Sequence, residues 1–298
     1  MKQSIFTWLE KKSVPKETLP LQNIFLHLTK ACNLHCTYCY FSARKPLLNE
    51  MTTNEFAHLW PEIVTLRPQK VVFTGGEPLL RSDILSLLRG LRDADPNHYV
   101  QRCLNTNGHL VTEELARKLV GLADEVRVSL DAMPKRNDAI RGKGNFEAAV
   151  RALEIYYSLG FEPKVLVTIT SISLPDLEEL LCFLIEKKFT RINLNSFRPI
   201  GRGKGREWHA DVAAVKTAVE SAWKRCHPDQ PILPAPPQPE TQCHCGVGQF
   251  LNILPNGNVF PCHMLTTPEF RIGNVREQSL LDICHRHGLL GELAALDF

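Results

Sequence analysis

Several features that would assign a chain to a simple class are missing from these 298 residues. No run of about 18 apolar residues occurs, and a transmembrane helix would need one. The first residues, MKQSIFTWLEKKS, lack the uninterrupted apolar segment of a secretory signal peptide. We therefore expect a cytoplasmic protein that does not enter a membrane and whose thiols stay reduced.

A strong charge of one sign is also missing. Lysine and arginine number 35, and aspartate and glutamate number 32, so the net charge is only +3. Nucleic-acid binding needs a concentrated basic surface, so we expect no nucleic-acid partner. Hydrophobic residues make up 44% of the chain and charged residues 22%, which is typical of a globular protein with one large domain, or one large and one small domain.

Cysteine, by contrast, is plentiful, with ten residues, and three of them lie within CNLHCTYCY at Cys32, Cys36 and Cys39. At this composition such a spacing occurs by chance in roughly 0.01 of chains, so it needs a cause. Structural zinc usually takes four ligands in paired C-x2-C units, and only His35 is at hand as a fourth ligand. An iron–sulfur cluster held by three thiolates would instead leave one iron open to a ligand.

Short apolar runs alternate with amphipathic stretches from about residue 20 to about residue 200. We expect strands at 23–29, 70–78, 99–108, 125–132, 163–170 and 191–197, and helices at 52–66, 82–93, 112–123, 145–160 and 174–188. Ser82 is the expected N-cap of the second helix, and Pro61 is a position where the first would kink or split. Alternating strands and helices predict an α/β fold with parallel strands, here a partial (βα)6 TIM-like barrel.

Four of the expected strands end in polar residues two positions apart, which places both members of a pair on one face of the strand. The pairs are Asn105 and Asn107, Ser129 and Asp131, Thr168 and Thr170, and Asn193 and Asn195. Loop-boundary polarity could explain any one pair. Four pairs at the carboxyl ends of parallel strands favour a polar ligand cavity there.

The sequence changes character after residue 200. Residues 201–226 are basic and then helical, and residues 227–240 hold six of the 20 prolines, which is typical of a linker or strap. The stretch FLNILPNGNVFPC at 250–262 predicts a β-hairpin with Asn256 and Gly257 in its turn, and two short helices are expected after it. We expect an N-terminal extension at 1–22, the barrel at 23–205, a helix and Pro-rich linker at 206–240, and a small domain at 241–298.

The cysteine motif after the first strand, TGGEPLLR (74–81) after the second, and the six βα units together resemble the radical S-adenosylmethionine (SAM) superfamily. The resemblance covers about residues 20–205. It implies that Cys32, Cys36 and Cys39, with Tyr38 as the aromatic neighbour, hold a 4Fe–4S cluster whose fourth iron is chelated by SAM. It further implies a one-electron donor such as flavodoxin or ferredoxin. Reductive cleavage of SAM would then give a 5′-deoxyadenosyl radical that removes a hydrogen atom from the substrate.

Other motifs of the superfamily match individual residues of this sequence. Gly75 and Gly76, followed by Glu77 and Pro78, match the segment that meets the methionine amino group, although a tight turn would also need such glycines. Ser129 in VSLDA matches a contact to SAM polar groups and could otherwise be a cap.

Two arginines complete this set of expected cofactor-binding residues. Arg141 in AIRGKG matches a contact to the SAM carboxylate and could otherwise be a solvated cation. Arg198 in FRPIGRG matches the position whose backbone lies near adenine.

The C-terminal segment resembles the SPASM/twitch extension of these enzymes as far as GNVFPC. That resemblance implies one auxiliary 4Fe–4S cluster with Cys243, Cys245 and Cys262 as ligands, and zinc is an alternative occupant. The fourth ligand is left open among Cys226, Cys284, His244, His263 and the substrate. Cys103 and Cys182 are expected to be core thiols.

The resemblance favours a peptide or protein substrate that is cross-linked, oxidised or otherwise matured. About 22 residues precede the first strand, so we expect no N-terminal peptide-binding domain and expect a separate partner to supply it. The alternatives are a small-molecule dehydrogenase or cyclase acting on an aminosugar or nucleotide, an iron–sulfur electron carrier, and a zinc-stabilised binding module. No catalytic acid, base or radical quencher is identified.

Overall fold

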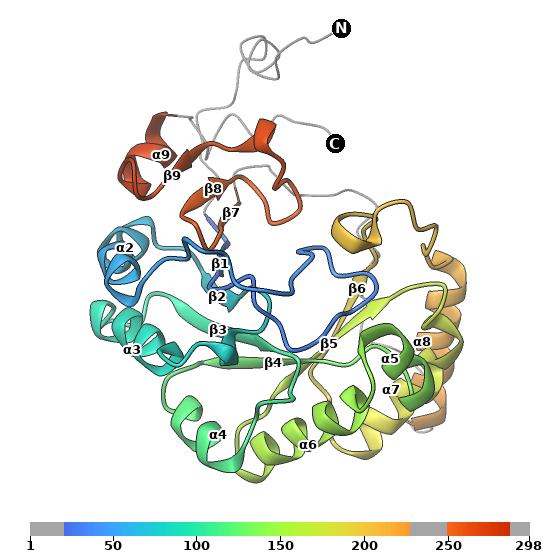
Figure 1. Cartoon of the computed structure of the whole chain (residues 1–298). Coiled ribbons are helices and arrows are strands. Elements are labelled where there is room, and N and C mark those ends of the chain that lie inside the picture. Colours follow the sequence, from blue (N-terminus) through green and yellow to red (C-terminus); the bar gives the residue numbers. More distant parts are fainter. Residues whose placement is uncertain (1–20, 227–248, 287–298) are drawn as a thin grey trace, which may run out of the picture.

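The computed structural model describes residues 21–226 and 249–286, and in these ranges it contains one nine-stranded sheet (Figure 1). The strand order is β6-β5-β4-β3-β2-β1-β7-β8-β9. Six parallel strands form the barrel portion: β1 (Asn23–His27), β2 (Lys70–Thr74), β3 (Gln101–Thr106), β4 (Glu125–Ser129), β5 (Lys164–Ile169) and β6 (Ile192–Ser196). The predicted partial barrel is therefore confirmed.

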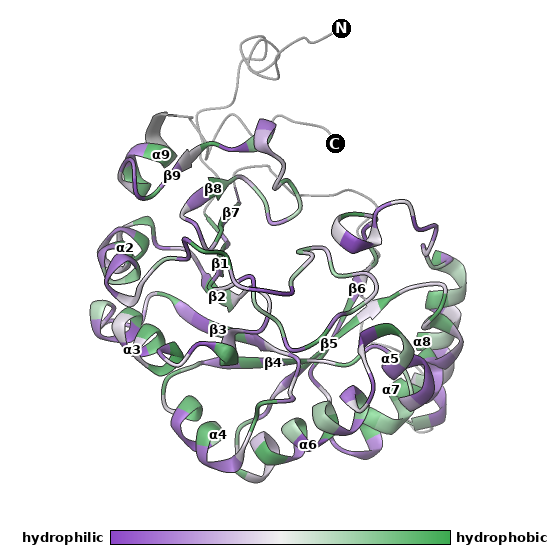
Figure 2. Ribbon diagram, viewed as in Figure 1, coloured by the Kyte–Doolittle hydropathy of each residue, from purple (hydrophilic) through white to green (hydrophobic). Residues whose placement is uncertain are grey.

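Helices lie around the outside of this curved sheet (Figure 1). They are α2 (Thr53–Leu66), α3 (Ile84–Ala94), α4 (Glu113–Val120), α5 (Pro134–Arg141), α6 (Asn145–Ser158), α7 (Leu177–Glu186), α8 (Val212–Cys226) and α9 (Leu280–Arg286). Hydrophobic and hydrophilic residues alternate along these helices, as expected where one side faces a sheet (Figure 2). Among the described residues, none of the helices has the length and apolar character needed to span a bilayer.

Two local predictions are corrected by the structure, and one helix is additional. The N-cap of α3 is Asp83 rather than Ser82, and its carboxylate is bonded to Arg81 and Thr53. Helix α2 runs through Pro61 without a break and begins at a capping box formed by Thr52 and Glu55. Helix α5 was not expected, because PKRNDAIR is polar and shows no apolar periodicity.

The two faces of the barrel strands differ. Alternate strand residues pack against the helices and are fully buried, for example Ile24, Val71, Leu104, Val126 and Val165. The residues between them point to the inner side, where polar side chains line a cavity. Apolar and polar residues alternate along these strands because only one face of the sheet is covered by helices.

The C-terminal segment joins the barrel sheet. Strand β7 (Phe250–Ile253) pairs in parallel with β1, and β8 (Asn258–Phe260) and β9 (Gly273–Asn274) follow in antiparallel pairing. The predicted β7–β8 hairpin is confirmed, with Gly257 at a φ of +85° in its turn. The pairing of β7 with β1 was not predicted, and it makes the hairpin a continuation of the barrel wall.

A buried polar pair lies close to this junction. His27 at the end of β1 is fully buried beside the rings of Tyr40 and Phe41, and neither of its ring nitrogens has a hydrogen-bond partner. Both amide atoms of Asn252 on β7 are likewise buried and unpaired. Burial lowers the pKa of His27 to about 3; the nearby His263 and Lys30 act in the same direction, and the neighbouring side chain of Asn252 opposes them.

This shift predicts a pH dependence of stability. Unfolded His27 titrates near pH 6.5 and folded His27 near 3, so unfolding takes up a proton below pH 6.5 and stability is lost as the pH falls. Between pH 7.5 and 5.5 the wild type should lose about 1.4 kcal/mol more than His27→Leu. Urea unfolding of both proteins at each pH measures the difference, and parallel pH profiles would contradict it.

Candidate functional site

The three clustered cysteines lie on a segment without regular secondary structure, which we call the cysteine loop (residues 30–44). A short backbone bridge closes the loop: Cys32 N–H donates to the carbonyl of Arg44 at 3.2 Å, and Arg44 N–H donates to Lys30 at 2.9 Å. Cys32, Cys36 and Cys39 are free thiols and partly exposed. All three line one cavity of about 760 Å³ on the inner side of the barrel.

Most of the predicted site residues line this same cavity. They are Tyr38, Gly75, Gly76, Glu77, Ser129, Arg141 and Arg198. Pro78 does not line it, and instead begins a short 3-10 helix, η1 (Pro78–Leu80). Cys262 is buried just after β8, and its neighbours His263 and Met264 reach the cavity. Cys243 and Cys245 lie outside the described residues, as does the Pro-rich stretch 227–240.

The strand-end pairs supply the polar wall that the sequence predicted. Asn105, Asn107, Ser129, Thr168, Asn193 and Asn195 all line the cavity. Asp131 and Thr170 do not, because both are used in internal hydrogen bonds. Asp131 accepts from the N–H of Thr168 at 2.8 Å, and Thr170 is bonded to Ser173.

The turn after β2 is pressed against the start of the cysteine loop. A Cβ on Gly76 would overlap the carbonyl oxygen of Ala31, and a Cβ on Gly75 would lie 2.6 Å from that of Thr29. Gly76 N–H donates to the carbonyl of Thr29 at 2.7 Å, and Glu77 N–H donates to the carbonyl of Ala31 at 2.8 Å. The glycines therefore serve the close approach of two backbone segments, as well as facing the cavity.

Glu77 is anchored rather than free to move. Its buried carboxylate accepts from the N–H of Leu79 at 3.1 Å, the hydroxyl of Thr106 at 2.9 Å and the N–H of Asn107 at 2.8 Å. Burial outweighs these hydrogen bonds and raises the pKa of Glu77 to about 7. The side chain thus ties the turn after β2 to the end of β3.

The segment after β6 also holds the cysteine loop in place, as a clamp that the sequence did not reveal. Arg202 Nε donates to the carbonyl of Cys36 at 2.8 Å, and its Nη1 donates to that of Ala43 at 2.7 Å. Its backbone N–H donates to the carbonyl of Cys39 at 3.0 Å. Gly201, at a φ of +57°, lies so close to the loop that a Cβ would overlap the carbonyls of Cys39 and Tyr40.

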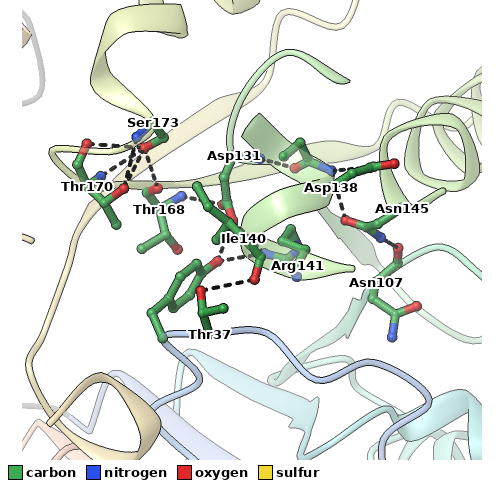
Figure 3. A network of polar contacts seen from close by, with 12 residues as sticks. Thr37, Asn107, Asp131, Asp138, Ile140, Arg141, Asn145, Thr168, Thr170 and Ser173 are labelled. Carbon is green, nitrogen blue, oxygen red and sulfur yellow. Dashed lines mark hydrogen bonds and ion pairs between the residues drawn. The ribbon is translucent and has the colours of Figure 1, made fainter. Parts of the chain in front are cut away.

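Helix α5 holds the loop from a third side (Figure 3). The N–H and hydroxyl of Thr37 donate to the carbonyl of Ile140 at 2.9 and 3.1 Å. The Tyr38 hydroxyl donates to Asp131, and Arg141 Nη1 donates to Tyr38 at 2.7 Å and to Asp131 at 2.9 Å. Behind this triad, Asn137 and Asn145 link α5 and α6 to the carbonyl of Asn107.

Comparison with known families decides the family of the chain. The sequence model of the radical SAM superfamily matches residues 26–195, which is more than half of the chain. The chain belongs to the radical SAM superfamily. A second model, the SPASM iron–sulfur cluster-binding domain, matches residues 243–290. The two matches imply 4Fe–4S clusters and SAM as cofactors.

Individual relatives in the superfamily act on different substrates. Mycofactocin maturase MftC of Mycolicibacterium smegmatis is 31% identical over 263 residues, which cover 83% of this chain and 66% of that protein. The Fe-coproporphyrin III synthase of Methanosarcina barkeri is 32% identical over 203 residues, covering 65% of this chain and 50% of that protein. The chain thus spans between half and about two thirds of the length of these relatives.

Solved radical SAM structures share the fold. The structure of anSMEcpe with bound AdoMet and Cp18Cys peptide superposes with a TM-score of 0.71 at 19% identity, covering 89% of this chain and 80% of that one. Streptococcus suis SuiB bound to precursor peptide SuiA gives a TM-score of 0.74 at 18% identity, covering 94% and 68%. At these identities the likeness concerns the fold alone.

The residues present fit a radical SAM cofactor pair. Three cavity-lining residues carry a buried polar atom without a hydrogen-bond partner, namely the donor Nε of Arg141, the acceptor Oδ1 of Asn105 and Nδ1 of His263. A ligand that carries both a carboxylate and an amino group, as the methionine part of SAM does, offers the complementary acceptor and donor.

The thiols fit a cluster better than a single ion. In the described part of the chain, no three His, Cys, Asp or Glu side chains converge closely enough to hold one metal ion. Thiolates around an iron–sulfur cube stand further apart, because the cube lies between them. Burial raises the pKa of Cys32 to about 11, whereas the charges of Arg141 and Arg202 oppose that effect at Cys36.

The other cysteines have separate surroundings. Cys103 and Cys182 are buried, which confirms them as core thiols. Cys226 at the end of α8 lies beside Cys182 on α7. Burial raises the pKa of Cys182 to about 12, and the neighbouring Cys226 adds to the effect. Cys284 on α9 is buried near Glu62 of α2.

The contact between Gly76 and Ala31 predicts a large effect of one methyl group. Gly76→Ala should lower the free energy of unfolding of the apoprotein by about 2 to 3 kcal/mol, because the two backbones must separate. Gly121→Ala is the matched control, since no atom lies within 4 Å of a Cβ there and its φ is −84°. Thermal or urea unfolding measures both variants, and equal effects would exclude this role for Gly76.

The hydrogen bonds of Arg202 predict that its substitutions reduce iron binding to different extents. Arg202→Gln removes hydrogen bonds worth about 2 to 4 kcal/mol to the cysteine loop and should lower the iron bound per chain after reconstitution. Arg202→Lys keeps the charge and one donor and should bind an intermediate amount of iron. The iron content and the electron paramagnetic resonance (EPR) spectrum of each protein test this. Wild-type values for Arg202→Gln would show that the clamp is dispensable.

Proposed function

We propose that this radical SAM enzyme matures a peptide or protein substrate. The observation that carries the proposal is the composition of the cavity that contains the three thiols. The predicted cluster ligands and SAM contacts form one part of its wall, and neutral hydrogen-bonding side chains with residues of the C-terminal segment form another. Its volume of about 760 Å³ lies in the upper half of the range of roughly 300–1,000 Å³ for ligand pockets, so it suits a cofactor together with part of a substrate.

Within this proposal the chain's own residues position and protect the cofactors. Cys32, Cys36 and Cys39 hold the first cluster, and Arg141 and Asn105 contact the methionine part of SAM. When bound, the cluster and SAM supply the reductive chemistry that removes a hydrogen atom from carbon. The clamps on the cysteine loop keep the thiols in place, and the surrounding barrel limits the access of water.

The second wall of the cavity favours a peptide. Asn193, Asn195 and Thr168 present amide and hydroxyl groups, which pair well with peptide N–H and C=O groups. Phe250 and Met264 offer apolar surface for a side chain. The relative named mycofactocin maturase and the neighbours solved with Cp18Cys peptide and SuiA support the same substrate class.

The remaining assignments belong to the same proposal. Cys243, Cys245 and Cys262 hold an auxiliary 4Fe–4S cluster, and a separate peptide-binding partner presents the precursor peptide. The C-terminal segment from 241 onwards is the auxiliary-cluster unit. A small-molecule substrate is the second candidate, because the relative named Fe-coproporphyrin III synthase is as similar in sequence as the maturase.

Anaerobic turnover tests the proposal. Reconstituted protein with dithionite and SAM should form 5′-deoxyadenosine, and a short peptide encoded beside the gene should change in mass in the same reaction. Cys36→Ala should abolish both signals, because a cluster with two thiolates is not retained.

Cys182→Ala is the control, since this thiol lies in the core on α7 and away from the cavity wall. It should leave both products in place. Formation of 5′-deoxyadenosine by Cys36→Ala would overturn the cluster assignment. Turnover of a porphyrin, aminosugar or nucleotide with no change in any peptide would overturn the substrate class.

A further inference from the structure

The cavity wall is rich in cations and poor in anions. Four arginines line it, namely Arg127, Arg141, Arg198 and Arg202. Among the described residues, Glu77 is the acidic side chain that lines it, and its carboxylate is already held by hydrogen bonds from neighbouring groups. The wall therefore carries an excess of positive charge before any ligand binds.

Three of these arginines are engaged by the protein itself. Arg127 and Arg141 are each paired with a buried carboxylate. The side chain of Arg202 donates to two backbone carbonyls of the cysteine loop. These three guanidinium groups therefore help to hold the wall of the cavity together.

Arg198 differs from the other three. It is half-buried, and its guanidinium forms no ion pair or hydrogen bond with any residue that the structure describes. Its backbone is fixed, because its carbonyl accepts from Ile200 N–H at 2.9 Å and the adjoining Phe197 is buried. A partly desolvated cation without a partner is unfavourable, and an anionic ligand would supply the partner.

The surroundings of Arg198 combine charge with aromatic surface. Arg198 follows β6, at one end of the strand order, and His263 follows β8, near the other end. Burial lowers the pKa of His263 to about 4, and the charge of Arg198 acts in the same direction, so the two side chains lie near each other. The ring centroid of Phe25 lies 4.3 Å from that of His263 and 6.3 Å from that of Phe250, and all three residues line the cavity.

The predicted SAM contacts lie in another part of the wall. Burial raises the pKa of Cys36, and the charges of Arg141 and Arg202 oppose that effect, which places these two arginines near the thiols. Arg141 is also the residue proposed to contact the methionine part of SAM. Arg198 lies towards the C-terminal segment instead, so it is available to a second anion that arrives with the substrate.

We propose that Arg198 binds a carboxylate of the substrate through charge-assisted hydrogen bonds from its guanidinium. A peptide offers such a group at its C-terminus or on an aspartate or glutamate side chain. Phe25 and Phe250 contact the apolar part of the peptide beside it. The carboxylate thereby determines which residue of the peptide faces the first cluster. This inference rests on the proposed function, because the carboxylate belongs to the peptide substrate.

Binding of small model compounds tests the role of Arg198 without turnover. The protein is reconstituted anaerobically, saturated with SAM and titrated by ligand-observed nuclear magnetic resonance (NMR). N-acetylglycine carries a terminal carboxylate, and N-acetylaspartate α-amide carries a side-chain carboxylate. Their neutral counterparts are N-acetylglycinamide and N-acetylasparagine α-amide. Wild type should bind at least one acid about tenfold more tightly than its neutral counterpart, and the acid that is preferred identifies the source of the carboxylate.

Substitutions assign this preference to one side chain. Arg198→Gln should bind the acids and their neutral counterparts equally. Arg198→Lys keeps the charge but loses the planar pair of donors, so its preference should be intermediate. Lys204→Gln is the matched control, because it removes an exposed cation from the same segment that does not line the cavity. It should keep the wild-type preference.

Equal affinity of wild type for the acids and their neutral counterparts would overturn the proposal, as would a preference that persists in Arg198→Gln. Weaker SAM binding by Arg198→Gln with an unchanged preference would assign the side chain to the cofactor and also overturn it. Failure of wild type to form 5′-deoxyadenosine with dithionite would count against the proposed function instead. The NMR titration would still decide the role of Arg198.

Discussion

The site depends on how an irregular loop is held in place. The cysteine loop has no helix or strand of its own, so the positions of its three thiols are set by contacts from other elements. The glycine turn after β2, Arg202 after β6 and α5 after β4 hold it from three sides. These elements are far apart in sequence and meet only when the barrel is complete. Formation of the thiol site is therefore coupled to folding of the whole barrel.

One face of the barrel strands forms the hydrophobic core, and the other face lines the cavity. One face packs against the helices with fully buried aliphatic side chains, and the other presents amides, hydroxyls and arginines to the cavity. Two of these arginines are balanced by buried carboxylates, Arg141 by Asp131 and Arg127 by Glu125. The inner wall therefore remains polar without a large excess of buried charge, which would be costly inside a protein.

Local sequence predicted most elements of the barrel, and most of the site residues that it singled out line the cavity. Alternation of period two placed Asn105, Ser129 and Thr168 on the inner face, and the thiol spacing marked the loop itself. What local sequence could not supply was the pairing of distant segments. The parallel pairing of β7 with β1 and the hydrogen bonds from Arg202 to the cysteine loop produce no periodic pattern in the sequence. Each depends on the assembled fold.

The junction between β1 and β7 has a consequence for how the protein is made. Strand β1 leaves the ribosome more than 200 residues before its partner β7, which begins at Phe250. Until most of the chain has been synthesised, one edge of β1 keeps its backbone groups unpaired, and such an open edge invites association with other chains. The sheet of the barrel and the C-terminal extension are therefore completed in one step, after β7 has been synthesised.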